Sequence, residues 1–356
     1  MSDLLKRFTG WDVAVIAVLV LFVVVASATV DNFASARNLS FLVLDLAPVL
    51  LIALPMTLII VTGEIDLSVA STLGLSSAVM GALWDGGMSI ELIVVVCLVL
   101  GAVLGAVNGL FVTVFGLPSL AVTIGTLALY RGLALVVLGD AAVAQFPGTW
   151  TGWVIGGNAG IPNIVWPLLL LLVVFGVVLH ATPFGRSLFV MGANKEAARF
   201  GGIRVARTTF WLYVVCGVVS ALAGILWTLR YSSARADNGS GLELAVVAAV
   251  LLGGVSIFGG RGTLWGVLGG VTLLAALQNA LRLADVSNEA LTVVTGLLLI
   301  ISVLAPNAVG AIRSAASRRR PPGGAATSPA PPDPPAPASS PPVQSDPSSS
   351  PAVRSS

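Results

Sequence analysis

Few side chains in this sequence could carry out acid–base or metal chemistry. The single histidine is His180, and the two cysteines, Cys97 and Cys216, lie far apart inside apolar runs. No second histidine, cysteine or carboxylate is spaced to share a metal with His180, and lone cysteines in apolar runs behave as small apolar side chains. We therefore expect no metal site, no disulfide and no catalytic residues, and the sequence does not indicate an enzyme.

The sequence also lacks a motif that binds nucleotide phosphates. A phosphate loop requires Gly-Lys before Ser or Thr, whereas the two lysines, Lys6 and Lys195, follow Leu5 and Asn194. We therefore expect no cofactor in this chain, and energy for any driven process must come from outside it. The net charge of +2 is too small to indicate nucleic acid as a partner.

Ionisable residues within or beside the apolar runs are candidates for function, because burying an unpaired charge in lipid is costly. Asp45 lies inside one such run, Glu64 and Asp66 lie at a break between two runs, and Arg131 lies inside another. Asp45 could line a pathway or form a structural pair. Arg131 could pair with Asp45 or Asp66 or reach an interface, and we favour a structural role. Asp45, Asp66 and Arg131 are the candidates for a pathway or its gate.

The composition is that of a multi-pass membrane protein. The 356 residues are 56% hydrophobic and 10% charged, with a mean hydropathy of +0.99. Soluble chains carry about 25% charged residues. Such long apolar runs are stable only in lipid or against each other. The sequence therefore predicts an all-α polytopic membrane protein and excludes a water-soluble enzyme.

The apolar runs predict about ten transmembrane helices, at roughly 20 residues for each crossing. They lie at residues 11–30, 39–61, 66–83, 91–114, 119–139, 164–180, 209–229, 243–258, 263–281 and 290–306. Lys6 and Arg7 precede the first run, and no small-residue cleavage site follows it, so we interpret it as a retained anchor.

Basic residues accumulate in cytoplasmic loops, and their distribution favours a cytoplasmic N-terminus and a cytoplasmic C-terminus. In that orientation the basic residues on the outer side are Arg37, Arg230, Arg235 and Arg282. Residues 1–316 form the predicted transmembrane domain. Residues 317–356 are rich in Pro, Ala and Ser and poor in large apolar side chains, which predicts a disordered cytoplasmic tail.

The longest predicted cytoplasmic loop, residues 181–208, holds five basic residues and one acid, Glu196. Basic residues alone would make it an anchor on the inner side of the membrane. The local pattern indicates more. Asn194 is placed to cap a short amphipathic helix over residues 194–199, and glycines 201–202 are placed to end it.

Glycines at four-residue spacing predict close helix packing in two of the spans, since they share one helix face. They are Gly101, Gly105 and Gly109 in one span, and Gly262, Gly266 and Gly270 at another. Chance is the alternative in a chain with 39 glycines. Residues 63–70 and 241–247 both place an acid among apolar residues at the start of a run, which favours two inverted halves of five spans. Acids at helix starts are also favoured by the helix dipole alone.

Four segments, in this order, resemble the permease subunits of bacterial ATP-driven (ABC-type) importers of the ribose, xylose, rhamnose and autoinducer-2 type. The segments are residues 63–69, 116–132, 184–203 and 241–263. The resemblance extends over nearly all of residues 10–306. It implies a subunit of a bacterial cytoplasmic (inner) membrane importer that carries a monosaccharide into the cell.

The resemblance gives the loop 181–208 a role. Glu196-Ala197-Ala198 with Gly202 matches the E-A-A-x-x-x-G pattern of importer permeases, in which this segment is the coupling helix that docks on a separate ATPase. The residues implied in coupling are Gly192, Asn194, Glu196, Ala197, Ala198 and Gly202. The implied partners are an ABC ATPase subunit that holds ATP and Mg²⁺, a periplasmic or lipoprotein sugar-binding receptor, a second permease copy, identical or different, and membrane lipid.

The chain departs from the family pattern at two positions. Glu64 stands where a second glycine is usual, which leaves the role of that turn open, and Lys195 stands where a proline is frequent. Residues 234–237, 255–260 and 284–288 look more like rhamnose-type than ribose-type permeases, and the sugar stays open. The alternatives are an ABC permease for branched-chain amino acids or nucleosides, and an ion-coupled carrier. The scarcity of mid-membrane acids speaks against a carrier.

Overall fold

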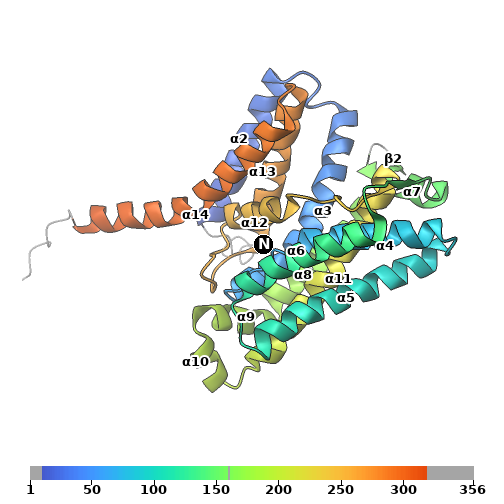
Figure 1. Cartoon of the computed structure of the whole chain (residues 1–356). Helices are drawn as coiled ribbons and strands as arrows, with labels where there is room; N and C mark the ends of the chain where they lie inside the picture. The colour runs from blue at the N-terminus through green and yellow to red at the C-terminus, as the bar shows by residue number, and fades with distance from the viewer. Residues whose placement is uncertain (1–9, 159–160, 319–356) are drawn as a thin grey trace, which may run out of the picture. The chain divides into compact units, whose positions relative to one another are not determined.

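The computed structural model of the chain describes residues 10–158 and 161–318 (Figure 1). The chain divides into two compact units, residues 1–309 and 310–356, and the description below concerns the first. The predicted tail, residues 317–356, lies outside the described residues apart from the last two residues of the final helix.

The described residues form thirteen helices and four strands of two residues each. In chain order they are α2 (Gly10–Thr29), α3 (Ala36–Val61), α4 (Val69–Asp85), α5 (Ile90–Thr113), α6 (Ser119–Leu138), β1 (Val143–Ala144), α7 (Gly148–Ile155), β2 (Gly157–Asn158), β3 (Ile161–Pro162), α8 (Val165–Ala181), α9 (Pro183–Ala193), α10 (Lys195–Phe200), α11 (Val205–Tyr231), β4 (Ser233–Ala234), α12 (Leu242–Leu252), α13 (Leu264–Leu283) and α14 (Asn288–Arg318).

Each predicted apolar run coincides with a helix, but ten crossings are not confirmed. Within the described residues, six helices are long and apolar enough to cross a membrane: α2, α3, α5, α6, α11 and α13. The pair α8 and α9, bent by 67° at Thr182, makes a seventh candidate. At 1.5 Å per residue, the 11 residues of α12 reach about 16 Å, roughly half of a 30 Å hydrocarbon core. Its predicted extent to residue 258 is wrong, because the helix ends before Gly253 and Gly254.

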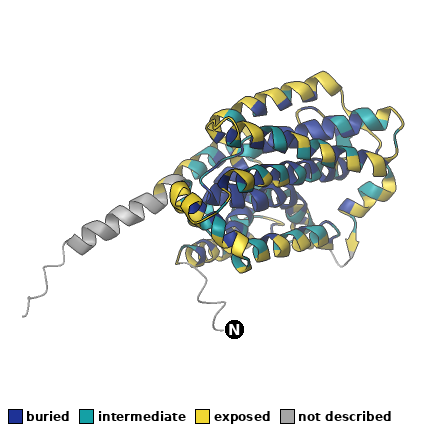
Figure 2. Cartoon of the chain, turned by 90° about the horizontal axis from the view of Figure 1, so that it is seen from below, coloured by how far each residue is buried: buried dark blue, intermediate teal, exposed yellow. Residues whose placement is uncertain are grey.

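The outer surface of the first unit is apolar, the reverse of a soluble protein. Figure 2 shows exposed residues along the outward faces of the helices and buried residues inside. Among the exposed side chains are Val136, Val114 and Leu170, at 81%, 69% and 64%. Contiguous apolar surface on this scale is stable only against lipid or protein. The chain is therefore a multi-pass membrane protein.

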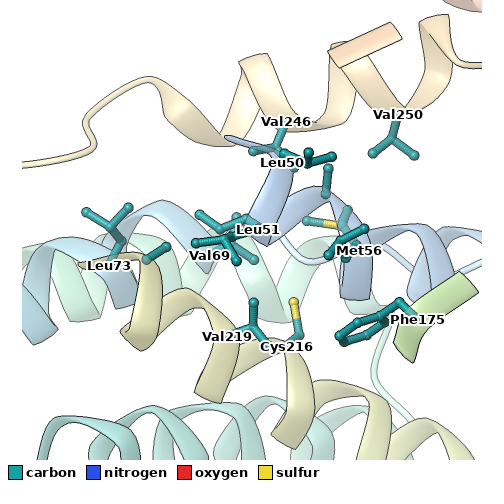
Figure 3. Packing of buried hydrophobic residues seen from close by; sticks show 14 of the residues in the cluster. Leu50, Leu51, Met56, Val69, Leu73, Phe175, Cys216, Val219, Val246 and Val250 are labelled. Carbon is teal, nitrogen blue, oxygen red and sulfur yellow. The ribbon is translucent and has the colours of Figure 1, made fainter. Parts of the chain in front are cut away.

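Helix α3 lies at the centre of the core. Its most apolar window is 83% buried, against 17% for α2 and 22% for α6. Figure 3 shows Leu50, Leu51 and Met56 of α3 surrounded by side chains of the neighbouring helices α4, α8, α11 and α12. Pro48 and Pro55 lie inside α3, and a membrane helix tolerates the missing backbone donors when neighbouring helices surround it.

The helices around α3 and α11 form two groups, visible on either side of α3 in Figure 1. Helix α11 packs on α4 and α5, and α4 also packs on α6. Helix α3 packs on α12 and α13, and α13 also packs on α2. Helix α11 therefore packs on helices that precede it in the chain, α3 packs on helices near the C-terminal end of the unit, and α3 and α11 contact each other.

The first glycine series lies at the closest approach of α5 and α11. A Cβ added at Gly101 would overlap the backbone of Gly217, and one at Gly105 would overlap the carbonyl of Tyr213. At Gly109 it would press on the backbone and ring of Phe210. All three glycines therefore face α11, as small residues on one helix face permit.

The second glycine series faces a different kind of neighbour. Added Cβ atoms at Gly266 and Gly270 would overlap backbone atoms of Gly253 and Ala249, so these two glycines face α12. Gly262 precedes α13, which begins at Leu264, and it has a φ of 145°. The two series therefore do not make equivalent contacts.

The segment between α6 and α8 contains short elements of its own. Helix α7 is followed by the antiparallel pair β2 and β3. Strand β1 pairs with β4, which lies just after α11. This pairing ties the segment to the end of α11, on the side of the molecule where α3 begins and α13 ends.

Replacing Gly105 with Ala tests the α5–α11 contact. We expect Gly105→Ala to lower the free energy of unfolding by about 1–3 kcal/mol, because the backbone at Tyr213 must move. Gly125→Ala in α6 is the matched control, since an added Cβ there meets nothing within 4 Å. Thermal unfolding of the purified chain in detergent measures both variants. Equal melting temperatures for the two would contradict the packing.

Candidate functional site

The short helix predicted after Asn194 is confirmed as α10. The Asn194 side chain accepts hydrogen bonds from the backbone N–H groups of Glu196 (2.9 Å) and Ala197 (3.0 Å), and so caps the helix. The helix ends at Gly201, and Gly202 follows with a φ of 81°, a conformation that favours glycine. The local sequence therefore contains the signals that begin and end this element.

Helix α10 projects a mostly exposed surface. Glu196 and Arg199 are exposed, and the ring of Phe200 is 92% exposed at the end of the helix. Ala198 is fully buried and holds the helix against the rest of the unit. Figure 1 shows α9 and α10 together at one end of the first unit. This surface is available to a partner.

The segment just before α10 contacts the ends of two membrane helices. A Cβ added at Gly192 would overlap the carbonyl of Val61, at the end of α3, and the backbone nitrogen of Gly260. The N–H of Gly260 in turn donates to the Val61 carbonyl at 2.8 Å. Gly192 therefore lets α9 touch the end of α3 and the loop after α12 at the same point.

An ion pair joins α10 to the segment between α3 and α4. Lys195 Nζ lies 2.5 Å from Glu64 Oε1. The Glu64 side chain is 12% exposed and that of Lys195 is 44% exposed. Both residues are departures from the family pattern, and the structure shows that they are partners. We call residues 62–68, which contain Glu64, the α3–α4 break.

Buried polar groups hold the α3–α4 break to the helices around it. The Asp66 carboxylate is buried and accepts from the backbone N–H (3.0 Å) and hydroxyl (2.7 Å) of Ser68, just before α4. The Asn108 amide of α5 donates to the Ser68 hydroxyl at 2.7 Å. The Thr126 hydroxyl of α6 donates to the Asn108 carbonyl oxygen at 2.7 Å. One chain of hydrogen bonds thus joins the break, α5 and α6.

Ile65 is held in the break through its backbone. Its carbonyl accepts from the Tyr213 hydroxyl at 3.1 Å and from the Thr123 hydroxyl at 3.4 Å. Its N–H donates to the Ser119 hydroxyl at 3.3 Å. Side chains of α6 and α11 therefore replace the backbone partners that a continuous helix would supply.

Asp45 lies at the other end of α3 and pairs with two arginines. Its carboxylate oxygens accept from Arg230, at the end of α11, and from Arg282, at the end of α13, the latter at 3.1 Å. Of the two roles expected for Asp45, this arrangement is the structural pair. The partner is not Arg131, because Arg131 uses its guanidinium elsewhere.

Arg131 donates to backbone carbonyls and not to Asp45 or Asp66. Its guanidinium reaches Ala236 (2.8 Å) and Asn238 (2.9 Å) in the loop after α11 and Ala70 (3.3 Å) in α4. The suggested pairs with Asp45 and Asp66 are therefore wrong. In the same loop Arg235 donates to Asp237 at 2.8 Å, which lowers the pKa of that carboxyl.

Sequence reasoning missed Asn108 and Tyr213, and it missed the pairing of Lys195 with Glu64. Asn108 and Tyr213 gave no signal, since a single polar residue in an apolar helix has no spacing to interpret. Lys195 and Glu64 were visible as departures from the pattern, but their pairing across 131 positions was not. The imidazole Nε2 of His180 accepts from the Leu264 N–H at 3.1 Å, and no group of three metal-binding side chains occurs among the described residues.

The apolar helical bundle, with a capped and exposed helix beside the α3–α4 break, is that of a multi-pass membrane protein. The chain belongs to the family of ABC-type importer permeases: residues 38–303 match the family model described as the permease component of the branched-chain amino acid transport system. It is similar to the autoinducer 2 import system permease protein LsrD of Escherichia coli strain K12, of E. coli O157:H7 and of Shigella flexneri. Each is 34% identical over 301 residues, which cover 83% of this chain and 91% of the relative. No solved structure matches the chain.

Exchanging the charges of Glu64 and Lys195 tests the ion pair. Glu64→Lys alone should lower the free energy of unfolding by about 1–3 kcal/mol, since a cation then lies at a buried position beside Lys195. Lys195→Glu should have an effect of similar size, because it leaves the buried Glu64 carboxylate without its partner and beside a second acid. The double exchange should recover much of the loss.

The matched control is the pair Arg235 and Asp237, which is more exposed on both sides. Exchanging the charges of Arg235 and Asp237 should change the free energy of unfolding by less than about 1 kcal/mol. A double-mutant cycle from thermal unfolding in detergent gives both coupling energies. Additive effects of Glu64→Lys and Lys195→Glu would show that the two side chains do not interact.

Proposed function

We propose that this chain is the membrane-spanning permease subunit of an ATP-driven importer that carries a monosaccharide into the cytoplasm. The observation that carries the proposal is the attachment of α10 to the membrane helices. An exposed, self-capped helix is joined to the α3–α4 break by the Lys195–Glu64 ion pair and by the contacts of Gly192. A force applied to α10 from outside the chain would reach α3 and α4 directly.

In the proposed mechanism α10 is the coupling helix of a separate ATPase subunit, which binds ATP and Mg²⁺. Closure of the ATPase would displace α10, and the displacement would move the α3–α4 break through Glu64. The hydrogen bonds from Asp66 to Thr126 would carry the movement to α5 and α6. The chain performs no covalent chemistry in this scheme, and the energy comes from the ATPase.

The proposed orientation places both termini in the cytoplasm of a bacterial cell, with the chain in the inner membrane. Glu64, Gly260 and α10 then lie together on the cytoplasmic side. Asp45, Arg230 and Arg282 lie together on the outer side. The contacts within each group agree with the sides that the basic residues favour.

We also propose the arrangement of ten crossings in two inverted halves, with α4, α12 and the apolar part of α14, Asn288–Ser302, as shorter segments supported by longer helices. The crossed packing supports it, because α11 contacts α4 and α5 as α3 contacts α12 and α13. The positive-φ glycines Gly63 and Gly241 give no support, since the rest of the α3–α4 break separates Gly63 from α4, whereas Gly241 immediately precedes α12. The glycine series give no support, since they face non-equivalent helices.

The proposed partners are the ATPase, an external sugar-binding receptor and a second permease copy, identical or different. The relatives are import permeases for autoinducer 2, and we propose a monosaccharide for this chain, with rhamnose as the first candidate from residues 234–237, 255–260 and 284–288. A second candidate is a branched-chain amino acid, which the description of the matched family favours.

Uptake into proteoliposomes that contain the chain, its ATPase, its second permease copy and its receptor tests the proposal. Labelled L-rhamnose, D-ribose and leucine are compared with internal ATP and with an ion gradient alone. We expect ATP-dependent uptake of a sugar. Glu196→Lys in the exposed surface of α10 should abolish it and leave receptor binding intact, because the surface that meets the ATPase changes sign.

Ser187→Ala in α9 is the matched control, since its exposed hydroxyl bonds only to the Phe184 carbonyl of its own turn. This variant should transport normally. Uptake driven by an ion gradient without ATP would contradict the proposal, and so would normal sugar uptake by Glu196→Lys. Uptake of leucine but not of sugars would favour the second candidate.

A further inference from the structure

A pocket lies at the end of the unit opposite α10, between α3, α11, α12 and α13. Its volume is about 80 Å³. Asp45 near the start of α3, Trp227, Arg230 and Tyr231 near the end of α11, and Gln278 near the end of α13 contribute to its wall. In the proposed orientation the pocket opens on the outer side of the membrane, and no role described above uses it.

One side of the pocket is polar, and one of its residues, Arg230, has a buried donor without a partner among the described residues. Both carboxylate oxygens of Asp45 accept from arginines, Oδ1 from Arg230 and Oδ2 from Arg282. The second guanidinium nitrogen of Arg230, Nη1, is buried and has no hydrogen-bond partner among the described residues. The Arg230 side chain is 10% exposed. A buried donor without an acceptor is unfavourable, so a movement of the Arg230 side chain that brings Nη1 to an oxygen of a bound molecule would be favoured.

The other side of the pocket is aromatic and aliphatic. The rings of Trp227 and Tyr231, one helical turn apart, have centroids 5.2 Å apart and are tilted by 51°. The Arg230 guanidinium lies 4.7 Å above the Tyr231 ring. Val49 and Leu274 continue the apolar wall. Ligand pockets combine apolar and aromatic walls with a few fixed polar groups in this way.

A monosaccharide matches these two sides. Its hydroxyl oxygens accept from a guanidinium, and its hydroxyl hydrogens can be donated to the free lone pairs of Asp45 or to the carbonyl oxygen of Gln278. The amide nitrogen of Gln278 is occupied, since it donates to Thr295 at 3.0 Å. The C–H face of a sugar ring can pack on Trp227, an aromatic ring of large apolar area.

A zwitterionic amino acid matches less well. Its ammonium group would need a carboxylate that is not already neutralised. Asp45 is the acid in the wall of the pocket, and each of its oxygens already receives a guanidinium N–H. The pocket wall carries two arginines and one acid, so an added cation is repelled. A neutral polyhydroxylated ligand meets no such penalty.

We propose that this pocket is a binding site for a neutral monosaccharide on the outer side of the permease, with Arg230 and Trp227 as its principal contacts. The inference rests on the proposed function, because it takes the sugar as the transported class. A volume of about 80 Å³ holds only a few water molecules, at roughly 30 Å³ each in the liquid. The sugar is therefore held along one edge, with an affinity in the millimolar range.

Saturation-transfer difference NMR tests the site directly. The assembled complex of permease pair and ATPase, in lipid nanodiscs without receptor, is mixed with L-rhamnose, D-ribose, D-xylose or leucine at millimolar concentration. We expect a signal for at least one sugar and none for leucine. Arg230→Gln and Trp227→Leu should each lower the sugar signal by about fivefold or more, as loss of a charged hydrogen bond or an aromatic contact does.

Arg235→Gln is the matched control, because this outer-side arginine is exposed, pairs with Asp237 and does not contribute to the pocket. It should leave the signal unchanged. Thermal unfolding of each variant shows whether it is folded, and Gln278→Ala, which keeps the Asp45 ion pairs, replaces Arg230→Gln if that variant is unstable.

The absence of any sugar signal would overturn the proposal, as would a signal for leucine alone or a sugar signal that the pocket variants leave intact. Receptor-dependent uptake by the same complex separates this failure from failure of the proposed function. ATP-dependent sugar uptake without sugar binding in the pocket would contradict only the proposal that the pocket binds a sugar. The absence of sugar uptake would contradict the proposed function.

Discussion

The structure depends on one constraint: a helix that breaks inside a membrane bundle must have its backbone polar groups satisfied by neighbouring side chains. The α3–α4 break interrupts the chain beside the most buried helix. Tyr213 and Thr123 satisfy the carbonyl of Ile65, and Ser119 satisfies its N–H. Asp66 supplies the acceptor that the start of α4 requires. The helices α5, α6 and α11 are positioned around these bonds.

The same constraint explains why the break is a suitable place to apply force. A continuous helix that is buried on all sides would resist displacement, whereas a break held by side-chain hydrogen bonds has alternative arrangements of modest energy difference. Residues 181–208, the proposed coupling loop, contact the bundle at this point. Gly192 brings α9 against Val61, and Lys195 reaches Glu64. In the proposed mechanism, movement of α10 acts on this break.

The sequence predicted the elements whose determinants are local. Helix α10 follows from an asparagine cap and a glycine end, and the ten apolar runs follow from hydropathy. Hydropathy did not predict the lengths of the helices, because Gly253 and Gly254 end α12 inside an apolar run. The sequence also did not predict which residues pair across long distances in the chain. Asp45 contacts Arg230 and not Arg131 because α3 packs on α11 and brings the two residues together. The spacing of residues along the chain does not indicate that packing.

The central claim is that α10 drives the membrane helices through its attachment to the α3–α4 break. The most direct measurement uses the double variant Glu64→Cys and Lys195→Cys, joined by a short bis-methanethiosulfonate cross-linker that reductant removes. ATP-dependent uptake in proteoliposomes is measured before and after linking. The account predicts weak uptake in the unlinked protein and recovery when the link replaces the ion pair. Full uptake without the link, or loss of uptake on linking that reductant reverses, would contradict it.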